Sequence, residues 1–193
     1  DWPETLEWIK LNTPEDSIVA SWWDYGYWIS TVADRTTLTD NATLSTIQIE
    51  KVAQIFLSTP DESWNLLTAW DVDYVVVYVA AQRLDGNYDG NSLYVLNGGG
   101  DESKKPWFMR IGNVELSKYL EPDGRTGTSY FWNETLLGKM IPYDIALYYN
   151  DATQQSSETF QNEFVPISVL EINYDDEGNY PLKLVHTSPS FTN

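Results

Sequence analysis

A short aromatic stretch, Ser21–Trp28, constrains the fold of this chain more than any other part of its sequence. The residues just before it, 17–20, read Ser-Ile-Val-Ala and predict a short buried strand. The aromatic stretch should therefore lie where a strand ends and the chain turns, at the rim of a core. There the indole N–H groups of Trp22 and Trp23 and the carboxylate of Asp24 converge on a small volume. A hydroxyl group needs an acceptor for its proton and donors for its lone pairs, so this set predicts a hydroxyl-binding site.

The composition limits the kinds of protein and site that this chain can form. Its 193 residues, of which 42% are hydrophobic, predict a single folded domain. A net charge of -18 argues against a nucleic-acid partner, because phosphates would be repelled. The lack of cysteine excludes disulfides and thiolate metal sites, and the single histidine, His186, argues against a His-rich zinc site or a serine triad. The sequence holds no apolar run of about 18 residues that would predict a membrane span. It begins without Met, as expected for a piece of a longer protein.

Hydrophobic spacing predicts an α+β fold with a mostly helical core, a small central sheet and C-terminal β-strands. We expect helices at 1–12, 27–32, 43–58, 62–70 and 130–140, an interrupted, kinked helix near 101–120, and strands at 17–20, 36–39, 73–79, 164–172 and 180–187. The strand at 73–79 is apolar on both faces, which predicts a central position in the sheet. Residues 85–100 are rich in Gly, Asn and Asp and predict a loop. Residues 1–160 should form a helix-rich core and 161–193 a β-rich tail of one domain, 1–193.

The motif Trp-Trp-Asp-Tyr-Gly at 22–26 resembles the signature of the archaeal-type catalytic subunit of oligosaccharyltransferase, the membrane enzyme of asparagine-linked glycosylation. The surrounding sequence is similar as well, at 18–21, at 27–29 and at Asp-Asn-Ala-Thr 40–43, which leads into a predicted helix. A pentapeptide with two adjacent tryptophans is rare by chance. The resemblance covers 18–58 well and 101–111 in part, and it implies the C-terminal globular domain of such a subunit.

The resemblance implies a role for each residue of the motif. Trp22, Trp23 and Asp24 would bind the hydroxyl of the Ser or Thr that follows the acceptor Asn by two residues. The indoles would donate and the carboxylate would accept, which is the chemistry that the residue types predict on their own. Tyr25 and Gly26 would support the turn, Gly26 through a backbone conformation that a Cβ opposes. A site built for a hydroxyl rejects side chains without one, because its buried polar groups are then left unpaired.

A second motif lies in the predicted interrupted helix, where residues 101–109 read Asp-Glu-Ser-Lys-Lys-Pro-Trp-Phe-Met. Archaeal and eukaryotic members of the family carry Asp-x-x-Lys-x-x-x-Met/Ile on a kinked helix near the acceptor pocket. Two registers approach this pattern and each departs from it at one position: Asp101, Lys104 and Phe108, or Glu102, Lys105 and Met109. In either register an i,i+3 pair can meet on one helical face, so both stay open. The alternative is an ordinary charged helix start with an exposed ion pair worth at most about 1 kcal/mol.

The resemblance also implies what lies outside this chain. A divalent cation (manganese or magnesium), the catalytic carboxylates and the site of the lipid-linked oligosaccharide belong to the membrane region of the parent protein, so no catalytic residue is expected here. The partners would be an acceptor polypeptide with Asn-x-Ser/Thr and, through the membrane region, the lipid-linked donor. We expect the domain alone to be inactive and to lie on the external face of the cell membrane.

Two further patterns point to a cation and to covalent modification. Asp85, Asn87 and Asp89 alternate as in the first half of an EF-hand loop, but the twelfth position is a leucine where a glutamate is required. A looser calcium site and a solvated turn are the alternatives. Asn41 and Asn133 each begin an Asn-x-Thr sequon. Because Asn133 lies in a predicted helix, Asn41 is the better candidate for glycosylation.

A secreted carbohydrate-binding module and a glycosidase are the alternative functions, since both use exposed aromatic side chains and carboxylates. Either function would place the aromatic side chains along an exposed groove. Hydroxyl recognition instead predicts that Trp22 and Trp23 are mostly buried and that Asp24 lies at the surface.

Overall fold

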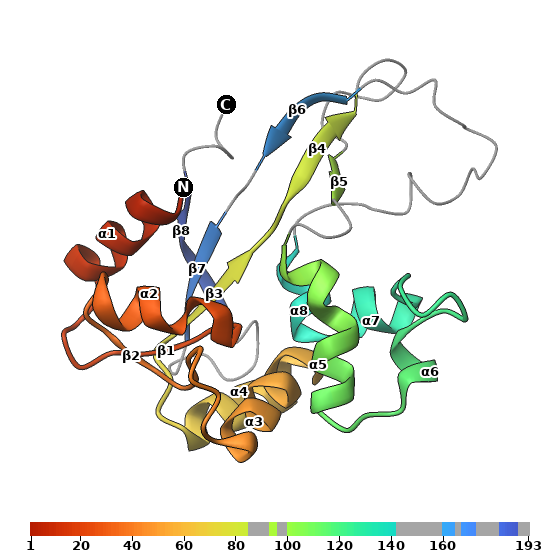
Figure 1. Ribbon diagram of the computed structural model, residues 1–193, viewed down its shortest axis with the longest axis horizontal. Coiled ribbons are helices and arrows are strands. Elements are labelled where there is room, and N and C mark those ends of the chain that lie inside the picture. The colour runs from red at the N-terminus through yellow and green to blue at the C-terminus, as the bar shows by residue number, and fades with distance from the viewer. Residues whose placement is uncertain (85–92, 96–99, 142–159, 165–166, 173–181, 189–193) are drawn as a thin grey trace.

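The apolar residues of Tyr74–Tyr78 form β3, the central strand of a five-stranded sheet in the computed structural model of this protein (Figure 1). The structure describes residues 1–84, 93–95, 100–141, 160–164, 167–172 and 182–188. The order across the sheet is β2 (Thr36–Thr37), β1 (Ile18–Ala20), β3, β7 (Ile167–Ile172) and β8 (Leu182–Thr187). The strand β1 is parallel to β2 and β3, whereas β7 is antiparallel to β3 and β8. The central position predicted for residues 73–79 is confirmed.

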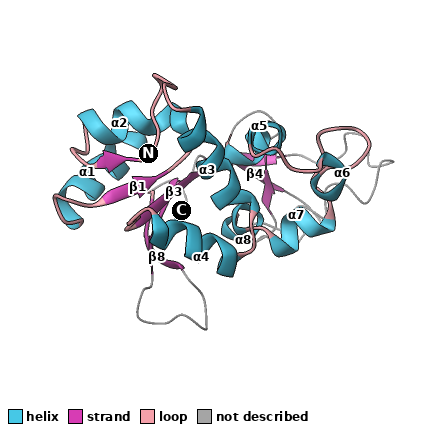
Figure 2. Cartoon of the chain, turned by 90° about the horizontal axis from the view of Figure 1, so that it is seen from below, coloured by secondary structure: helices cyan, strands magenta, loops and turns pink. Residues whose placement is uncertain are grey.

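Helices cover both sides of this sheet (Figures 1 and 2). On one side lie α1 (Trp2–Asn12) and α2 (Gly26–Thr31), and on the other lie α3 (Thr46–Leu57) and α4 (Pro60–Ala69). This arrangement follows from the strand order, because right-handed connections from β1 to β2 and from β2 to β3 run over opposite faces. The α4 helix begins with a capping box formed by Thr59 and Glu62. This box lies just after the end of α3 at Leu57.

A second helical group packs beside α3 and contains the predicted interrupted helix (Figure 1). It comprises α5 (Lys105–Ile111), α6 (Leu116–Tyr119), α7 (Ser129–Glu134) and α8 (Leu136–Met140). A 3₁₀ turn, Asp101–Lys104, precedes α5, and Pro106 lies in the first helical turn, where its missing N–H costs no hydrogen bond. After α5 the chain leaves the helix near Asn113, which has a positive φ of 54°. The interruption near 101–120 is therefore confirmed.

Two predicted segments differ from the structure. Residues 130–140 form two helices instead of one, because Thr135 is extended and its hydroxyl accepts the N–H of Gly138 to cap α8. Within 85–100, which we predicted as loop, Leu93–Val95 forms β5. These three residues favour strands and pair with β4 (Ala81–Leu84) in a small antiparallel sheet completed by β6 (Phe160–Phe164).

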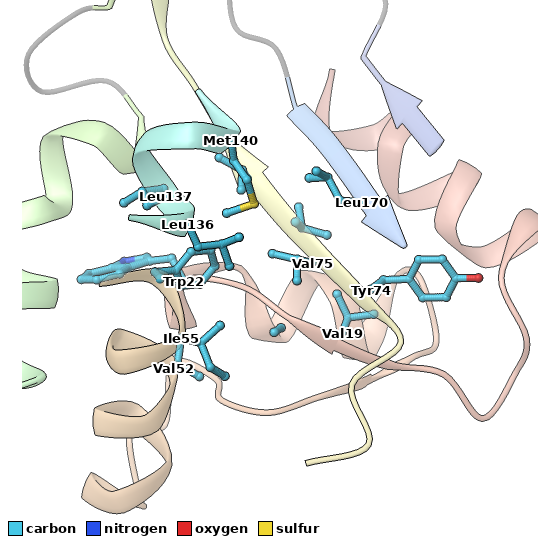
Figure 3. Close-up of a cluster of buried hydrophobic side chains, with 14 of the residues drawn as sticks. Val19, Trp22, Val52, Ile55, Tyr74, Val75, Leu136, Leu137, Met140 and Leu170 are labelled. Carbon is cyan, nitrogen blue, oxygen red and sulfur yellow. The ribbon is translucent and has the colours of Figure 1, made fainter. Parts of the chain in front are cut away.

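The core joins the sheet to both helical groups (Figure 3). Fully buried side chains come from β1, β3, α3 and α8, among them Val19, Val75, Val52, Ile55, Leu136 and Leu137. The β-rich tail contributes to the same core, because β7 pairs with β3 along its whole length. The chain thus has the predicted α+β fold with a central sheet, and the sheet needs the tail. In the described ranges no helix is both long and apolar enough to cross a membrane.

Candidate functional site

The aromatic motif forms the connection between the end of β1 and the start of α2. Trp22 is extended, with φ -54° and ψ 136°, and the chain then makes one 3₁₀ turn, Trp23–Tyr25, that continues directly into α2. The backbone N–H of Tyr25 donates to the carbonyl of Trp22 at 3.1 Å and closes this turn. The turn carries Asp24 outward while Trp22 and Tyr25 point into the protein, where both side chains are buried.

The two indoles of the motif stack on each other, and Trp22 also packs against α5. The ring centroids of Trp22 and Trp23 are 3.5 Å apart, and the ring of Trp22 lies 4.4 Å from that of Phe108. Trp22 is 4% exposed, and its indole Nε1 is buried without a hydrogen-bond partner among the described residues. Trp23 is half-buried at the edge of the core. The expected burial is found for Trp22, and less completely for Trp23.

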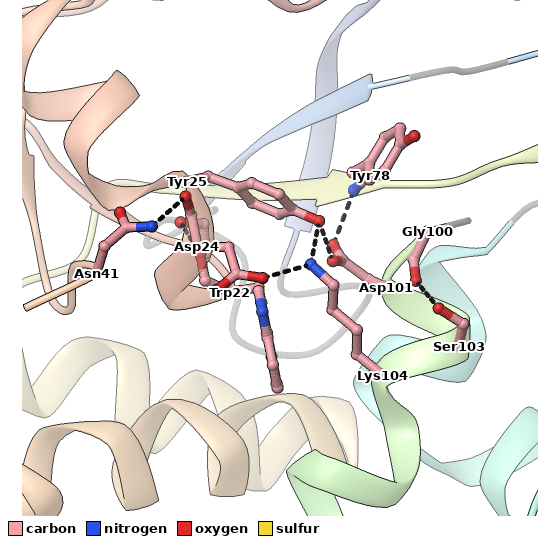
Figure 4. Close-up of polar contacts among 10 residues, drawn as sticks. Trp22, Asp24, Tyr25, Asn41, Tyr78, Gly100, Asp101, Ser103 and Lys104 are labelled. Carbon is pink, nitrogen blue, oxygen red and sulfur yellow. Dashed lines mark hydrogen bonds and ion pairs between the residues drawn. The ribbon is translucent and has the colours of Figure 1, made fainter. Parts of the chain in front are cut away.

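Lys104 links the motif to the second helical group (Figure 4). Its Nζ donates to Oδ2 of Asp24 at 3.0 Å and to the hydroxyl of Tyr25, also at 3.0 Å. The ammonium lies over the rings of Tyr25 and Trp22, at 4.6 and 5.2 Å from their centroids. The side chain of Asp24 is 50% exposed and that of Lys104 is 21% exposed. The lysine therefore holds one oxygen of an accessible carboxylate in a fixed place.

Beneath this ion pair, Asp101 forms a buried polar anchor. Its Oδ1 accepts the hydroxyl proton of Tyr25 at 2.7 Å, and its Oδ2 accepts the backbone N–H of Tyr78, the last residue of β3, at 2.8 Å. Burial raises the pKa of Asp101 to about 6, although these two donors and the nearby Lys104 lower it. Burial and the Asp101 charge also raise the pKa of the Tyr25 hydroxyl, which stays protonated. Tyr25 thus connects Asp101 to Lys104.

The two registers of the second motif lie in different places. Asp101 and Lys104 face the aromatic motif, whereas Lys105 forms a buried ion pair with Glu102. Burial raises the pKa of Glu102, opposed by the charge of Lys105. Phe108 and Met109 are both fully buried in the core. Phe108 contacts Trp22 from below the site, so neither side chain at this position of the pattern is open to a ligand.

Gly26 is required for space and not for an unusual backbone conformation. Its φ is -55°, in the ordinary helical region. A Cβ on this residue would lie 2.4 Å from the carbonyl oxygen of Thr39 and 2.5 Å from the Cα of Asp40. The prediction that Gly26 has a backbone conformation opposed by a Cβ is therefore wrong. A glycine is needed here because a neighbouring segment packs directly against it.

The structure describes only some of the remaining predicted sites. Asp85, Asn87 and Asp89 lie outside the described residues, so calcium binding there stays a prediction. The residues that the structure does describe contain no group of three or more His, Cys, Asp or Glu side chains that could hold a metal ion. Asn133 lies in α7, as predicted. Asn41 is exposed in a turn beside Asp24, and its glycosylation stays a prediction.

Sequence reasoning missed three contacts of this site. The hydroxyl of Tyr25, the backbone N–H of Tyr78 and the side-chain amide of Asn41 all take part in holding the motif. Asn41 lies within the 40–43 segment that resembles the family, which was the one available signal. The other two contacts join segments more than 20 residues apart and carry no local pattern.

Comparisons with known proteins agree with the motifs. Residues 15–87 match the family model described as the STT3/PglB/AglB core domain. The chain is 33% identical over 187 residues to the dolichyl-diphosphooligosaccharide–protein glycosyltransferase subunit STT3 of Saccharomyces cerevisiae, covering 92% of this chain and 24% of the relative. It is 30% identical over 192 residues to the STT3 subunit of Dictyostelium discoideum, covering 100% of this chain and 25% of the relative. The chain thus spans about a quarter of the length of these curated relatives.

Among solved structures, the chain is similar to the C-terminal globular domain of an oligosaccharyltransferase from Archaeoglobus fulgidus, with a TM-score of 0.49 and 25% sequence identity. That match covers 72% of this chain and 79% of the other. The family assignment itself rests on the sequence, because the residues matched by the core-domain model contain the aromatic motif and β1 to β3, and the yeast relative matches 92% of the chain. The chain belongs to the STT3/PglB/AglB family of oligosaccharyltransferases.

Proposed function

We propose that this chain is the acceptor-recognition part of an oligosaccharyltransferase. Trp22, Trp23 and Asp24 bind the hydroxyl of the Ser or Thr two residues after the acceptor Asn. The chain positions that Asn for transfer of a glycan from a lipid-linked donor, which is catalysis by positioning. Relatives of this chain are named dolichyl-diphosphooligosaccharide–protein glycosyltransferase subunits.

The pairing of an accessible carboxylate with an unsatisfied donor carries this proposal. Asp24 presents a half-exposed carboxylate, fixed by Lys104, that can accept a proton from a hydroxyl. Two residues earlier in the sequence, the buried Nε1 of Trp22 has no partner among the described residues. A buried donor without an acceptor costs about 1–3 kcal/mol, so an oxygen that reaches it gains that free energy. A hydroxyl supplies both the proton and the lone pair.

The other parts of the reaction belong, in this proposal, to segments outside the chain. The described residues do not form a carboxylate or histidine cluster suited to manganese or magnesium, so no step of the mechanism is assigned to a metal here. The cation and the lipid-linked donor would bind in the membrane region of the longer protein. The chain would lie on the external face of the membrane, where acceptor polypeptides are available.

The two alternative functions are not favoured by the placement of Trp22 and of the carboxylates at this site. A sugar-binding groove needs exposed ring faces, but Trp22 is buried and its ring faces are covered by Trp23 and Phe108. A glycosidase needs two carboxylates that flank a substrate. The other carboxylate in the hydrogen-bond network of Asp24 belongs to Asp101. It is buried beneath Tyr25 and is 1% exposed, so a substrate cannot lie between the two.

Hydroxyl recognition can be tested by combining one substitution with two peptides. In the full-length protein, Trp22→Phe removes the indole donor and keeps an aromatic ring on Phe108. We expect transfer to an Asn-x-Thr peptide to fall about tenfold, the effect of one lost hydrogen bond. Transfer to the isosteric Asn-x-Val peptide, measured by mass spectrometry, should stay at its low wild-type level. Loss of packing would lower both rates together, so the change in their ratio isolates the hydroxyl.

The matched control is Trp8→Phe, the same substitution at a half-buried tryptophan of α1 that stacks on His186. It should leave the ratio of the two transfer rates unchanged. A Trp22→Phe protein that keeps the wild-type preference for Thr over Val would rule out indole donation to the acceptor hydroxyl.

The anchor beneath the site predicts a dependence on pH. Because burial raises the pKa of Asp101 to about 6, this carboxyl gains a proton as the pH falls through that value. The neutral acid is a weaker acceptor for the Tyr25 hydroxyl and the Tyr78 N–H, which should loosen the turn that carries Asp24. We expect kcat/KM for Asn-x-Thr peptides to decline below about pH 6, and Asp101→Asn to remove this acidic limb while lowering the plateau. An Asp101→Asn profile parallel to the wild-type profile would contradict this assignment.

A further inference from the structure

A single side chain joins the segment after β2 both to the 3₁₀ turn that carries Asp24 and to the first turn of α2. The Nδ2 of Asn41 donates to the backbone carbonyl of Asp24 at 2.9 Å (Figure 4). Its Oδ1 accepts the backbone N–H of Tyr27 at 3.3 Å. Asp24 and Tyr27 lie on either side of the junction between the 3₁₀ turn and α2. The Asn41 amide therefore bridges this junction with both of its polar atoms.

We propose that Asn41 is a positioning residue of the acceptor site, and that its sequon, Asn41-Ala42-Thr43, is not itself an acceptor, contrary to the glycosylation that the sequon alone predicts. This inference rests on the proposed function, because the group that Asn41 positions is the Asp24 carboxylate. Asn41 touches no substrate in this proposal. It acts by fixing the backbone from which the carboxylate projects.

The packing around Gly26 shows that the bridge joins two segments already in contact. A Cβ on Gly26 would overlap the carbonyl of Thr39 and the Cα of Asp40, so the backbones of the two segments touch. Such contact controls the distance between the segments but not how the peptide planes of the turn are oriented. Hydrogen bonds from Asn41 to one carbonyl and one N–H supply that orientation, because each bond is directional. Packing and the Asn41 amide together fix the backbone of Asp24, while Lys104 fixes its carboxylate.

The sequon is itself folded into a tight turn. The N–H of Ala42 donates to Oδ1 of Asp40 at 2.9 Å, and the N–H of Thr43 donates to the Asp40 carbonyl at 3.1 Å. Thr43 has a positive φ of 51°, which a β-branched residue rarely adopts. An acceptor Asn offers its amide nitrogen, but the nitrogen of Asn41 is already donating to Asp24. Use as an acceptor would break the hydrogen bond that holds the site, so the exposed sequon should stay unmodified.

Two substitutions separate positioning from glycosylation, and both are made in the full-length protein. Asn41→Asp is isosteric and keeps an acceptor for the N–H of Tyr27, but places an oxygen against the Asp24 carbonyl. Thr43→Ala destroys the sequon and leaves Asn41 in place. For an Asn-x-Thr peptide we expect KM to rise about tenfold with Asn41→Asp and kcat/KM to fall by a similar factor. Thr43→Ala should change both constants less than twofold, and mass spectrometry of the wild-type protein should find residue 41 unmodified.

The peptide pair Asn-x-Thr and Asn-x-Val distinguishes positioning from a general structural role. If Asn41 positions Asp24, Asn41→Asp lowers the rate ratio of Thr to Val, because recognition of the hydroxyl is impaired. Equal loss on both peptides, no loss on either, or equal effects of Asn41→Asp and Thr43→Ala would each overturn the inference. So would a glycan on residue 41 in most wild-type molecules. If the Asn41→Asp protein does not accumulate, Asn41→Ser removes both hydrogen bonds without adding a charge, and the same peptide ratio decides.

Asp24→Ala, assayed alongside, separates failure of this inference from failure of the proposed function. An Asp24→Ala protein with normal transfer would overturn the proposed function and the role of Asn41 with it. An Asp24→Ala protein with impaired transfer, together with normal ratios for Asn41→Asp, would leave the proposed function standing and overturn only the role of Asn41.

Discussion

Replacing Asp24 with alanine in the full-length protein is expected to lower kcat/KM for Asn-x-Thr peptides by about 10- to 100-fold. A hydrogen bond to a charged group contributes about 1.5–3 kcal/mol, and each 1.4 kcal/mol corresponds to a factor of ten. The carboxylate is half-exposed, so removing it leaves no cavity in the core. The ammonium of Lys104 loses one of its two partners and keeps the hydroxyl of Tyr25. The folded state should therefore lose little stability.

The matched control for this substitution is Asp16→Ala, which removes an exposed carboxylate in the turn before β1. It makes the same change in net charge, so it measures any general effect of charge on peptide binding. We expect its kcat/KM to stay within twofold of the wild-type value. Asp24→Asn adds a second comparison, because it keeps an acceptor oxygen but loses the charge. Its kcat/KM should lie between the values of the Asp24→Ala and Asp16→Ala proteins. Wild-type transfer by the Asp24→Ala protein would refute the proposed function.

Substitutions of the adjacent lysines 104 and 105 are expected to affect different properties, namely transfer and stability of the fold. Lys105→Met leaves the carboxylate of Glu102 buried without its partner, since the side chains of the pair are 3% and 8% exposed. Breaking a buried ion pair in this way costs about 3–5 kcal/mol. Lys104→Met breaks a more exposed pair, which contributes about 0–1 kcal/mol, but removes the group that holds Asp24. The first change should destabilise the fold, and the second should impair transfer.

Denaturant unfolding of the 193-residue chain measures the first effect, and the transfer assay measures the second. The double substitution Glu102→Gln with Lys105→Met removes both buried charges and should recover most of the lost free energy of unfolding. Burial raises the pKa of Glu102 in the folded state, so its charged form is the destabilising one. The deficit of Lys105→Met should therefore shrink as the pH falls through the folded-state pKa of Glu102. Equal destabilisation by Lys104→Met and Lys105→Met would contradict this division of roles.

Much of the fold could be predicted because its signals are local. The apolar run at 73–79 predicted a central strand, and the helical spacing at 43–58 predicted α3, which spans Thr46–Leu57. The interrupted helix predicted near 101–120 breaks just before α5, and Pro106 lies in the first turn of α5, where a proline is tolerated. The errors also have local causes. Thr135 splits a predicted helix by capping the next one with its own hydroxyl, which hydrophobic spacing does not register.

The sequence by itself determined which polar groups the candidate site contains. Two indoles and a carboxylate at the end of a buried strand predicted a hydroxyl-binding site, which stays a prediction, and the five-residue motif also predicted the family. Spacing alone could not choose between Lys104 and Lys105, because both can pair with an acid three residues earlier. Nor could it explain Gly26, whose conformation is ordinary.

Only the tertiary structure decided which groups surround that motif. Lys104 reaches Asp24 across 80 residues, Asp101 is anchored by the last residue of β3, and the segment after β2 touches Gly26. These contacts depend on strand order and on the packing of α5 against α3, which bring distant segments together. The physical reason is that burial and hydrogen-bond direction are properties of the assembled core. The motif therefore supplies the polar groups of the candidate site, and the fold decides which lysine and which asparagine hold Asp24 in place.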